Sequence, residues 1–431
     1  LYYDRGATFS KDMKIAVAAA NTLGGSTAVY TGVSFRPPRE VLKKWREEFG
    51  LDFLTDSYVK RTLDKIEKEI HVQTLDEKWD NDNNRLFAQG CRKLGIEPKR
   101  LRINIKNCKE QGFCNLGCTS GAKQSTLEVQ IPKALKAGAD LKCNTTVQGI
   151  RENEVFAIHA SGEKVSFRGK KIVVAAGALR SPILLQNSAK ELGIKNSNLG
   201  RYLTLHPAYN LHAVHSQVLK NYRGFPKTYY VDNFSETDHF YLETSFYYPG
   251  VTAKNIPGFG QEHFSLMQDY NKMMSILILY HDLPSKKARV YAKKGKLVLC
   301  YPIDSRLKKA MAKAIRQSVR IFFAAGAQQL KVPMSQGRLL TPKDEPYLEK
   351  LIQEKYFDAA KEPLSSAHPQ GGCRMSSLQK RGVCTVEGRV YGTNHVYVAD
   401  ASLFPTSVHV NPYETVMLLA NYVAEVVASE V

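Results

Sequence analysis

Three cysteines lie close together in the chain, at Cys108, Cys114 and Cys118, in the pattern C-x5-C-x3-C. Thiolates on a loop with this spacing can ligate an iron–sulfur cluster or a zinc ion. A four-iron cluster normally takes a fourth ligand, whereas a three-iron cluster needs three. Structural thiols or a disulfide are the alternatives, so the spacing by itself leaves the chemistry of this loop open.

A second group of reactive residue types lies near the C-terminus. His368 stands in the segment Ala-His-Pro-Gln-Gly-Gly-Cys-Arg-Met, and a histidine titrates near neutrality, so it can accept a proton from a substrate hydroxyl. Asn411 cannot titrate but can orient that hydroxyl by hydrogen bonding. His409 is a weaker candidate, with a positioning or structural role.

Asn411 and Pro412 also predict the start of a helix. Asn is a good N-cap, Pro suits the first helical position, and Glu414 stands three residues after Asn411, as in a capping box. The free N–H groups and the positive end of the helix dipole favour a negatively charged group at this end.

Two further segments contain residues suited to cofactor binding. Gly24-Gly25-Ser26-Thr27 combines paired glycines, which allow close backbone approach, with hydroxyls that can bind phosphate oxygens. The apolar run 172–176 ends at Gly177 and is followed by a helical pattern over 183–187. This is typical of a buried strand that turns into a helix.

Together these segments resemble the glucose-methanol-choline (GMC) family of FAD-dependent alcohol oxidoreductases. That family has a histidine segment, a strand ending in Asp-x-Ser-x-x-Pro and an Asn-Pro pair that opens a helix, and this sequence has all three in the same order. The resemblance runs from residue 1 to the C-terminus. It implies a mixed α/β fold, with a discontinuous Rossmann-like FAD-binding domain and an antiparallel-sheet substrate domain, and it implies FAD as the cofactor.

The resemblance also implies roles for individual residues. His368 corresponds to the base that takes the hydroxyl proton while hydride leaves the same carbon for the flavin, and Asn411 corresponds to its partner in the cholesterol oxidase branch. Tyr30 departs from the family, which usually has Asn or His at that position. The implied cofactor-binding positions are Gly24, Gly25, Ser26, Thr27, Val147, Ala176, Gly177, Asp400, Ala401, Asn411 and Pro412.

The cysteine loop resembles that of the membrane-associated sugar and sugar-acid dehydrogenases of the family, such as the fructose and gluconate dehydrogenases. Those enzymes carry a three-iron (3Fe-4S) cluster on such a loop. The resemblance therefore implies a cluster on Cys108, Cys114 and Cys118 that passes electrons to a partner. Long-chain alcohol oxidases of the family are also rich in cysteine here, so the pattern is not exclusive to the cluster.

The sequence has no G-x-G-x-x-G motif, although the family opens with a strand, phosphate loop and helix of that type. The simplest explanation is that the sequence lacks the first few dozen residues of the protein. A flavin-free electron-transfer or scaffold subunit is the alternative.

The change in composition along the chain predicts three segments. We expect an FAD-binding domain over residues 1–202 with a cysteine loop at 103–126, a substrate-binding domain over 203–360, and a return to the FAD-binding domain over 361–431. Within the middle segment, residues 289–301 predict a hairpin that turns at Lys294-Gly295.

The net charge is +20, and twelve Lys or Arg lie between Lys286 and Arg320 against one acid, Asp304. A basic amphipathic helix in this segment is most simply a solvated helix face. An electron-accepting subunit or an anionic membrane surface is the alternative docking partner. Nucleic acid is disfavoured because no known binding module accompanies the charge.

No apolar stretch is long enough to predict a membrane-spanning helix. The sequence does not indicate a cellular compartment, and a periplasmic or membrane-peripheral location is one possibility. The sequence therefore predicts an FAD-dependent alcohol dehydrogenase with an iron–sulfur relay. An oxygen-using oxidase of long-chain or sterol alcohols is the alternative.

Overall fold

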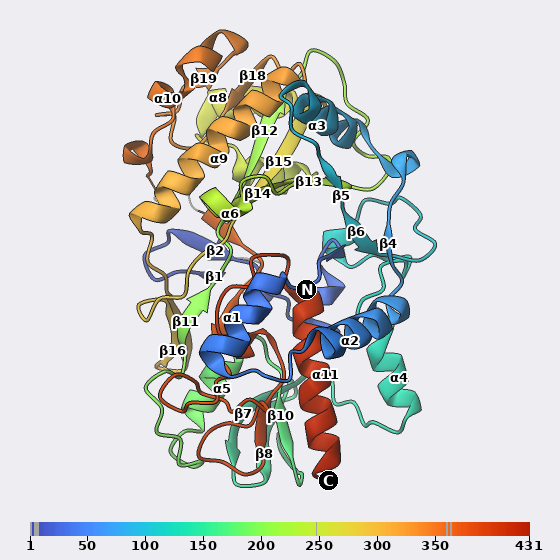
Figure 1. The fold of residues 1–431 in the computed structure, drawn as a ribbon, viewed down its shortest axis with the longest axis vertical. Coiled ribbons are helices and arrows are strands. Elements are labelled where there is room, and N and C mark those ends of the chain that lie inside the picture. Colours follow the sequence, from blue (N-terminus) through green and yellow to red (C-terminus); the bar gives the residue numbers. More distant parts are fainter. Residues whose placement is uncertain (1, 4–7, 247, 359–360, 363) are drawn as a thin grey trace.

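The computed structural model describes residues 2–3, 8–246, 248–358, 361–362 and 364–431. Within these residues the largest sheet has ten strands and occupies most of the upper half of Figure 1. Eight strands follow one another in the order β1 (Thr8–Phe9), β2 (Ile15–Val17), β20 (Leu364–Ser366), β12 (Ala208–Val214), β15 (Met273–Tyr280), β14 (Phe240–Thr244), β13 (Tyr229–Val231) and β5 (Lys99–Arg100). The remaining two, β18 (Gln329–Lys331) and β19 (Leu339–Leu340), extend from β12.

The centre of this sheet is antiparallel, as predicted for the middle of the chain. β15 pairs with β12 on one side and with β14 on the other. Because side chains alternate between the two faces of a strand, each of these strands presents a different set of residues to each side. One face is apolar and belongs to the largest hydrophobic cluster, with Leu211, Leu242 and Ile276 among its members.

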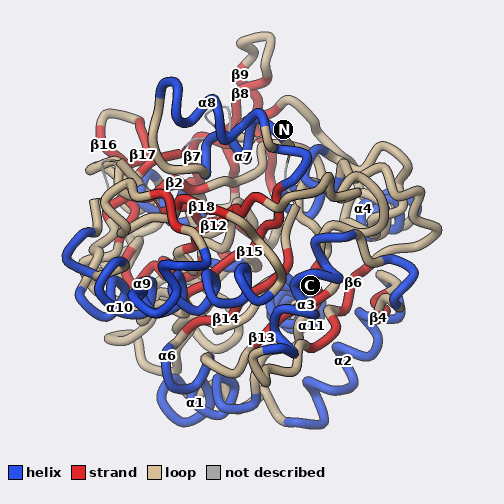
Figure 2. Tube along the Cα trace, turned by 90° about the horizontal axis from the view of Figure 1, so that it is seen from above, coloured by secondary structure: helices blue, strands red, loops and turns tan. Residues whose placement is uncertain are grey.

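Two helices cover that apolar face, α9 (Ser305–Ala324) and α3 (Asp82–Lys93). α9 is the basic amphipathic helix predicted from the sequence, and its buried side includes Met311, Ile315 and Phe322. Asp304 caps it, since its carboxylate accepts a hydrogen bond from the Leu307 amide. Figure 2 shows α8 (Gly260–Gln268) on the other side of β12 from α9.

The lower half of Figure 1 contains the strand, turn and helix that the sequence predicts at 172–187. β10 (Ile172–Val174) pairs in parallel with β22 (Val396–Val398), and α5 (Ser181–Asn187) follows β10 as predicted. The long C-terminal helix α11 (Tyr413–Ser429) runs down this half to the C-terminus. One neighbouring sheet has the strand order β17 (Lys296–Cys300), β16 (Arg289–Lys293), β11 (Arg201–Thr204) and β21 (Gln370–Gly372). Another has the order β7 (Thr145–Arg151), β8 (Glu154–His159) and β9 (Lys164–Arg168).

The predicted hairpin is confirmed, because β16 and β17 pair around Lys294-Gly295 and both turn residues have positive φ. A third small sheet joins the segment after the glycine loop to the cysteine loop, and it contains β3 (Val33–Ser34), β6 (Arg102–Asn104) and β4 (Val72–Thr74). The remaining α-helices are α1 (Arg39–Phe49), α2 (Asp56–Glu69), α4 (Gln130–Lys136), α6 (Ser235–Asp238), α7 (Pro249–Asn255) and α10 (Leu348–Leu351).

The Pro- and charge-rich segment from Pro342 onward contains the short helices η6 (Pro342–Tyr347), α10 and η7 (Glu354–Tyr356). Thr341 and Asp344 form a capping box there, which starts a helix in spite of the prolines. Arg389 and Val390 make isolated bridges, to Tyr397 and Cys384. The domain boundaries expected after residues 202 and 360 stay predictions.

No helix within the described residues combines enough length with enough apolar character to cross a bilayer.

Candidate active site

The parallel pairing of β10 and β22 brings two predicted cofactor segments to one edge. Because the strands are in register, Ala176-Gly177 after β10 and Asp400-Ala401 after β22 leave the sheet side by side. Asp400 ties them together: its carboxylate accepts hydrogen bonds from the Gly177 amide at 2.8 Å, the Ser181 hydroxyl and the Ser402 amide at 2.7 Å. In open α/β sheets, this carboxyl edge is where ligands bind.

The glycine loop forms a short 3-10 helix, η2 (Gly25–Ala28), after a sharp turn at Gly24. Gly24 has φ +83°, and a Cβ there would lie 2.8 Å from the Leu127 Cβ, so only glycine fits. The Thr27 hydroxyl donates to the Gly24 carbonyl and contacts the Thr126 hydroxyl. Gly25 and Ser26 remain exposed.

Tyr30, where the sequence departs from the family, is engaged within the protein. Its hydroxyl accepts a hydrogen bond from the Asn104 side chain at 2.5 Å. Its ring meets Tyr413 edge-on, with the ring centroids 5.0 Å apart. Tyr30 therefore links the glycine loop to the first residue of α11.

Asn411 does not cap α11, which corrects the sequence-based prediction. The cap position belongs to Pro412, with no side-chain cap, and the Asn411 Oδ1 accepts a hydrogen bond from the Tyr241 hydroxyl at 2.6 Å. The predicted capping box is also absent, since neither carboxylate oxygen of the buried Glu414 has a hydrogen-bond partner. The reason is tertiary: Tyr241, on β14, takes the Asn411 oxygen that a local cap would use.

His368 is held by another histidine. It follows β20, and its Nδ1 lies 3.3 Å from the Nδ1 of His206, which lies between β11 and β12. Burial, together with the nearby positive charge of Lys227, lowers the pKa of His368 to about 3. The imidazole of His368 is therefore neutral at physiological pH and able to accept a proton.

The facing Nδ1 atoms determine which nitrogen of His368 can act. One of the two must carry the shared proton for a hydrogen bond to form. If His368 Nδ1 carries it, His368 Nε2 keeps a free lone pair and His206 Nε2 is protonated, facing the Ser407 Oγ at 2.6 Å and the Gln370 Nε2 at 3.2 Å. Only this tautomer makes His368 Nε2 a proton acceptor.

Contacts through two more aromatic residues join His368 to Asn411. The rings of His206 and His281 are 6.1 Å apart, and His281 lies 5.1 Å from the Tyr241 ring. His409 stacks on His281 at 5.1 Å, which is a packing role. Sequence reasoning missed His206 and His281. The one signal for His206 was its His-Pro pair after a strand, which repeats the His368-Pro369 pattern.

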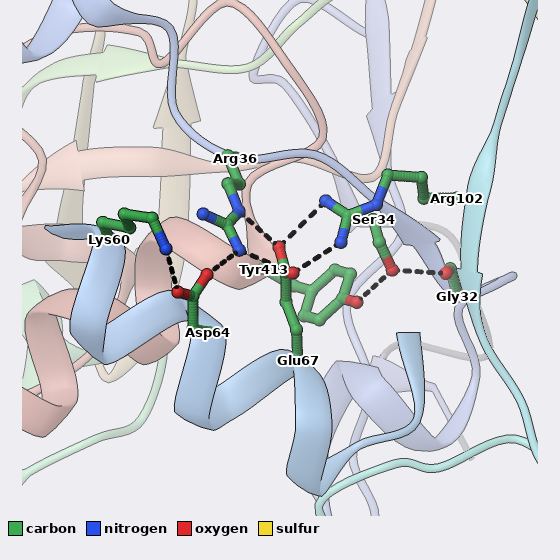
Figure 3. Close-up of polar contacts among 8 residues, drawn as sticks. All are labelled: Gly32, Ser34, Arg36, Lys60, Asp64, Glu67, Arg102 and Tyr413. Carbon is green, nitrogen blue, oxygen red and sulfur yellow. Dashed lines mark hydrogen bonds and ion pairs between the residues drawn. The ribbon is translucent and has the colours of Figure 1, made fainter. Parts of the chain in front are cut away.

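An ion-pair cluster joins the segment after the glycine loop to α2 and β6, beside the first residue of α11 (Figure 3). Glu67 of α2 lies between two guanidiniums and accepts two hydrogen bonds from each, at 2.6 and 2.7 Å from Arg36 and at 2.9 and 2.5 Å from Arg102. Arg36 also bonds Asp64. The Tyr413 hydroxyl is hydrogen-bonded to the Ser34 hydroxyl. The cluster therefore joins the segment after the glycine loop to the helix that Asn411 precedes.

Glu414 and Glu67 have pKa values displaced in opposite directions. Burial and the negative charge of Glu67 raise the pKa of Glu414 above its usual value. Hydrogen bonds from Arg36 and Arg102 outweigh desolvation and lower the pKa of Glu67. Glu414 thus keeps its proton in the folded protein while Glu67 stays ionised.

We expect the substitution Glu414→Gln to stabilise the protein increasingly as pH rises. The unfolded chain ionises Glu414 near pH 4.5, whereas the folded chain must keep the proton to a higher pH. The contribution of Glu414 to the free energy of unfolding is therefore fully present below pH 4.5, and it is lost as the pH rises toward the folded-state pKa. Thermal unfolding at pH 5 and pH 7.5 should give a gain of about 2 kcal/mol at the higher pH, at about 1.4 kcal/mol per pKa unit.

The exposed Glu236→Gln serves as the matched control, with no change in the pH slope. Equal stability of wild type and Glu414→Gln at both pH values would show that Glu414 is ionised in the folded state.

The cysteine loop packs against the glycine loop through a buried lysine. The Lys123 ammonium donates to the carbonyl oxygens of Ala28, Tyr30 and Cys114 at 2.9, 2.7 and 2.6 Å. Burial lowers the pKa of Lys123 to about 8 and raises that of Cys114 to about 12. In the absence of a metal, a thiol with so high a pKa is protonated.

The predicted iron–sulfur site is not supported by the arrangement of side chains. All eight cysteines are free thiols, and no group of three or more His, Cys, Asp or Glu side chains in the described part of the chain could hold a metal ion. Instead, Cys108 and Cys114 pack against an apolar cluster, and the Cys118 sulfur accepts a hydrogen bond from the Lys123 amide.

Four of the six basic residues of α9 form ion pairs within the fold, with three carboxylates. Arg306 pairs with Asp304, Lys313 with Asp238, and Arg316 and Arg320 both pair with Glu349. Such pairs favour the solvated-face interpretation over a docking surface for a partner.

The fold has close counterparts among solved structures. A formate oxidase variant from Aspergillus oryzae superposes with a TM-score of 0.72 at 16% identity, covering 96% of this chain and 85% of that one. Pyridoxine 4-oxidase from Mesorbium loti gives a TM-score of 0.70 at 16% identity, with the same coverage. These likenesses confirm the mixed α/β fold with a Rossmann-like FAD-binding part.

Sequence comparisons identify relatives over nearly the whole chain. The long-chain-alcohol oxidase FAO4A of Arabidopsis thaliana is 27% identical over 97% of this chain, and the chain spans 60% of that protein's length. An uncharacterized GMC-type oxidoreductase of Mycobacterium tuberculosis is 27% identical over 100% of this chain and 68% of its own. Profiles of the GMC oxidoreductase N- and C-terminal regions match residues 1–208 and 292–420. The chain therefore belongs to the GMC oxidoreductase family.

Proposed function

We propose that this protein oxidises an alcohol carbon with FAD as cofactor and dioxygen as electron acceptor. The observation that carries the proposal is the half-buried His368, whose Nδ1 contacts His206 and whose surroundings connect through His281 and Tyr241 to Asn411. Family membership supports the same chemistry.

The residues at the proposed cofactor site fit the flavin end of FAD. Gly25 has φ +57° and no atom within 4 Å of a Cβ placed there, so a planar group can approach its backbone. The proposed contacts are those implied by the resemblance: Gly24, Gly25, Ser26, Thr27, Val147, Ala176, Gly177, Asp400, Ala401, Asn411 and Pro412. When bound, FAD supplies the acceptor for hydride. The Asp400 carboxylate accepts three hydrogen bonds from the protein and holds the two turns together.

The protein groups then have separate tasks. His368 Nε2 accepts the hydroxyl proton of the substrate, while its Nδ1–H stays bonded to His206. Asn411, with its oxygen fixed by Tyr241, turns its Nδ2 donor toward the substrate oxygen. The first-turn N–H groups of α11 have no side-chain cap, so they remain available to a negatively charged group.

Dioxygen is the acceptor that the relatives support. The relatives and solved structures named above whose activities are given are oxidases, among them a plant long-chain-alcohol oxidase. A relay through Cys108, Cys114 and Cys118 to a partner subunit has no comparable support, because the side-chain arrangement offers no metal-binding group among the described residues. We therefore prefer the oxidase to the dehydrogenase with a cluster.

The absorption spectrum of the FAD-loaded, full-length protein tests this proposal. Anaerobic addition of a primary alcohol should bleach the flavin bands, and admission of air should restore them. A broad iron–sulfur absorption beneath the flavin, with slow recovery in air, would favour the relay instead. No bleaching with any primary, secondary or polyhydroxy alcohol would overturn the proposed function.

A further inference from the structure

The face of the large sheet opposite α9 and α3 is unusually polar for a buried surface. On this face β12 presents Asn210 and His212, β14 presents Tyr241 and Glu243, and β15 presents Ser275 with two leucines. Asn210, His212, Glu243 and Ser275 are at most 6% exposed. Polar groups buried to this extent normally need partners, so each unpaired atom requires an explanation.

The polar face begins at the proposed catalytic residues. Tyr241 donates to Asn411, and Glu243 is the next residue of β14 on the same face, about 7 Å further along the strand. The pairing places Glu243 opposite Leu277, and Leu277 opposite Asn210. Glu243 and Asn210 therefore flank an apolar strip of Leu277 and Leu279, with about 10 Å between the two outer strands.

Two hydrogen-bond acceptors, one on Glu243 and one on Asn210, have no partner among the described residues. The Glu243 Oε2 is paired with the Lys227 ammonium at 2.7 Å, but its Oε1 has no hydrogen bond. The Asn210 Nδ2 lies 2.8 Å from His212 Nε2, and the Asn210 Oδ1 is likewise unpartnered. Both free atoms accept hydrogen bonds, so a ligand that satisfies them must supply donors.

The far end of the face is closed by apolar packing. Val214 and Met273, the next same-face residues of β12 and β15, pack with Ile256 and Leu266 near α7 and α8. A molecule anchored at Asn411 would therefore extend along the leucine strip and end beside the two acceptors.

We infer that the substrate carries a second hydroxyl group, which donates to one of the two free acceptors, the Glu243 Oε1 or the Asn210 Oδ1, while its carbon skeleton lies on Leu277 and Leu279. The inference rests on the proposed function, because it takes the reacting carbinol to lie at His368 and Asn411. A hydroxyl supplies one donor without adding charge, whereas an ammonium group would lie beside the positive Lys227. A simple alkyl chain would leave both acceptors buried and unsatisfied, which costs affinity.

The test compares each primary alkanol with the α,ω-diol of equal length, over roughly four to eight carbons, since the strand spacing predicts the reach. The FAD-loaded protein should show kcat/KM for the preferred diol at least about 10-fold above that for the alkanol, after correction for its two hydroxyls. Glu243→Gln places an amide NH2 donor at the free position while its oxygen faces Lys227, and Asn210→Leu removes the amide oxygen. Whichever of the two variants removes the acceptor in use should lower this ratio about 10-fold. The exposed Glu236→Gln should leave the ratio unchanged.

The outcomes separate this inference from the proposed function. If the wild-type ratio of kcat/KM for diol to that for alkanol is near one at every chain length, the inference is overturned, whether or not the variants fold. The inference is also overturned if kcat/KM falls equally for alkanol and diol in both variants. Failure of every alcohol to bleach the flavin overturns the proposed function instead.

Discussion

The substitution His368→Asn should reduce kcat/KM for alcohol oxidation by about 10²–10⁴-fold, the usual contribution of a general base. Asparagine can keep the hydrogen bond to His206, but it has no nitrogen that corresponds to Nε2, so the hydroxyl proton has no acceptor. The FAD content of the variant should match that of wild type, because His368 is proposed to act on the substrate. Steady-state oxygen consumption, together with the flavin spectrum, measures both quantities.

His368 also predicts the pH dependence of the wild type. Since its pKa is lowered to about 3, His368 is already deprotonated at pH 5, and kcat/KM should not fall between pH 8 and pH 5 through its protonation. The exposed His159→Asn is the matched control and should keep full activity. A loss of less than tenfold in His368→Asn would assign the proton transfer to another group.

The substitution Lys227→Met should lower the free energy of unfolding by about 3–5 kcal/mol, because it leaves the Glu243 carboxylate buried without a counter-charge. Lys227 and Glu243 have side chains only 6% and 0% exposed, and their charged atoms are 2.7 Å apart. Denaturant unfolding of the FAD-loaded protein at neutral pH measures the change.

The double variant Lys227→Met with Glu243→Met should recover most of the loss, since removing both charges also removes the desolvation cost. Lys43, whose pair with Glu47 is exposed, gives the comparison, and Lys43→Met should change stability by less than about 1 kcal/mol. A double variant no more stable than Lys227→Met would mean that Lys227 acts through contacts other than Glu243.

The sequence predicted the parts of the site that depend on local signals. The run 172–176, Gly177 and the helix at 183–187 form the predicted strand, turn and helix, because apolar strands and positive-φ glycines have local signatures. The α9 helix and the β16–β17 hairpin were predictable for the same reason. The order of the motifs was enough to indicate the family.

The same local reasoning was wrong for Asn411 and Glu414, and it did not anticipate the state of the cysteine loop. A capping box is a local rule, but the Tyr241 hydroxyl from 170 residues away occupies the Asn411 oxygen. Cysteine spacing likewise cannot show that the Lys123 ammonium lies against the Cys114 carbonyl, or that burial keeps the Cys114 thiol protonated.

What the sequence alone determined is which segments we propose to carry the chemistry: the glycine loop, the turn after β10, His368 and the start of α11. Only the tertiary structure decided their partners, namely His206 for His368, Tyr241 for Asn411, Asp400 for Gly177, and Lys227 for Glu243. The physical reason is that a strand's alternation shows which residues share a face but not what lies opposite that face. Three of these four contacts join residues more than 160 positions apart, and chain folding alone brings them within hydrogen-bond distance.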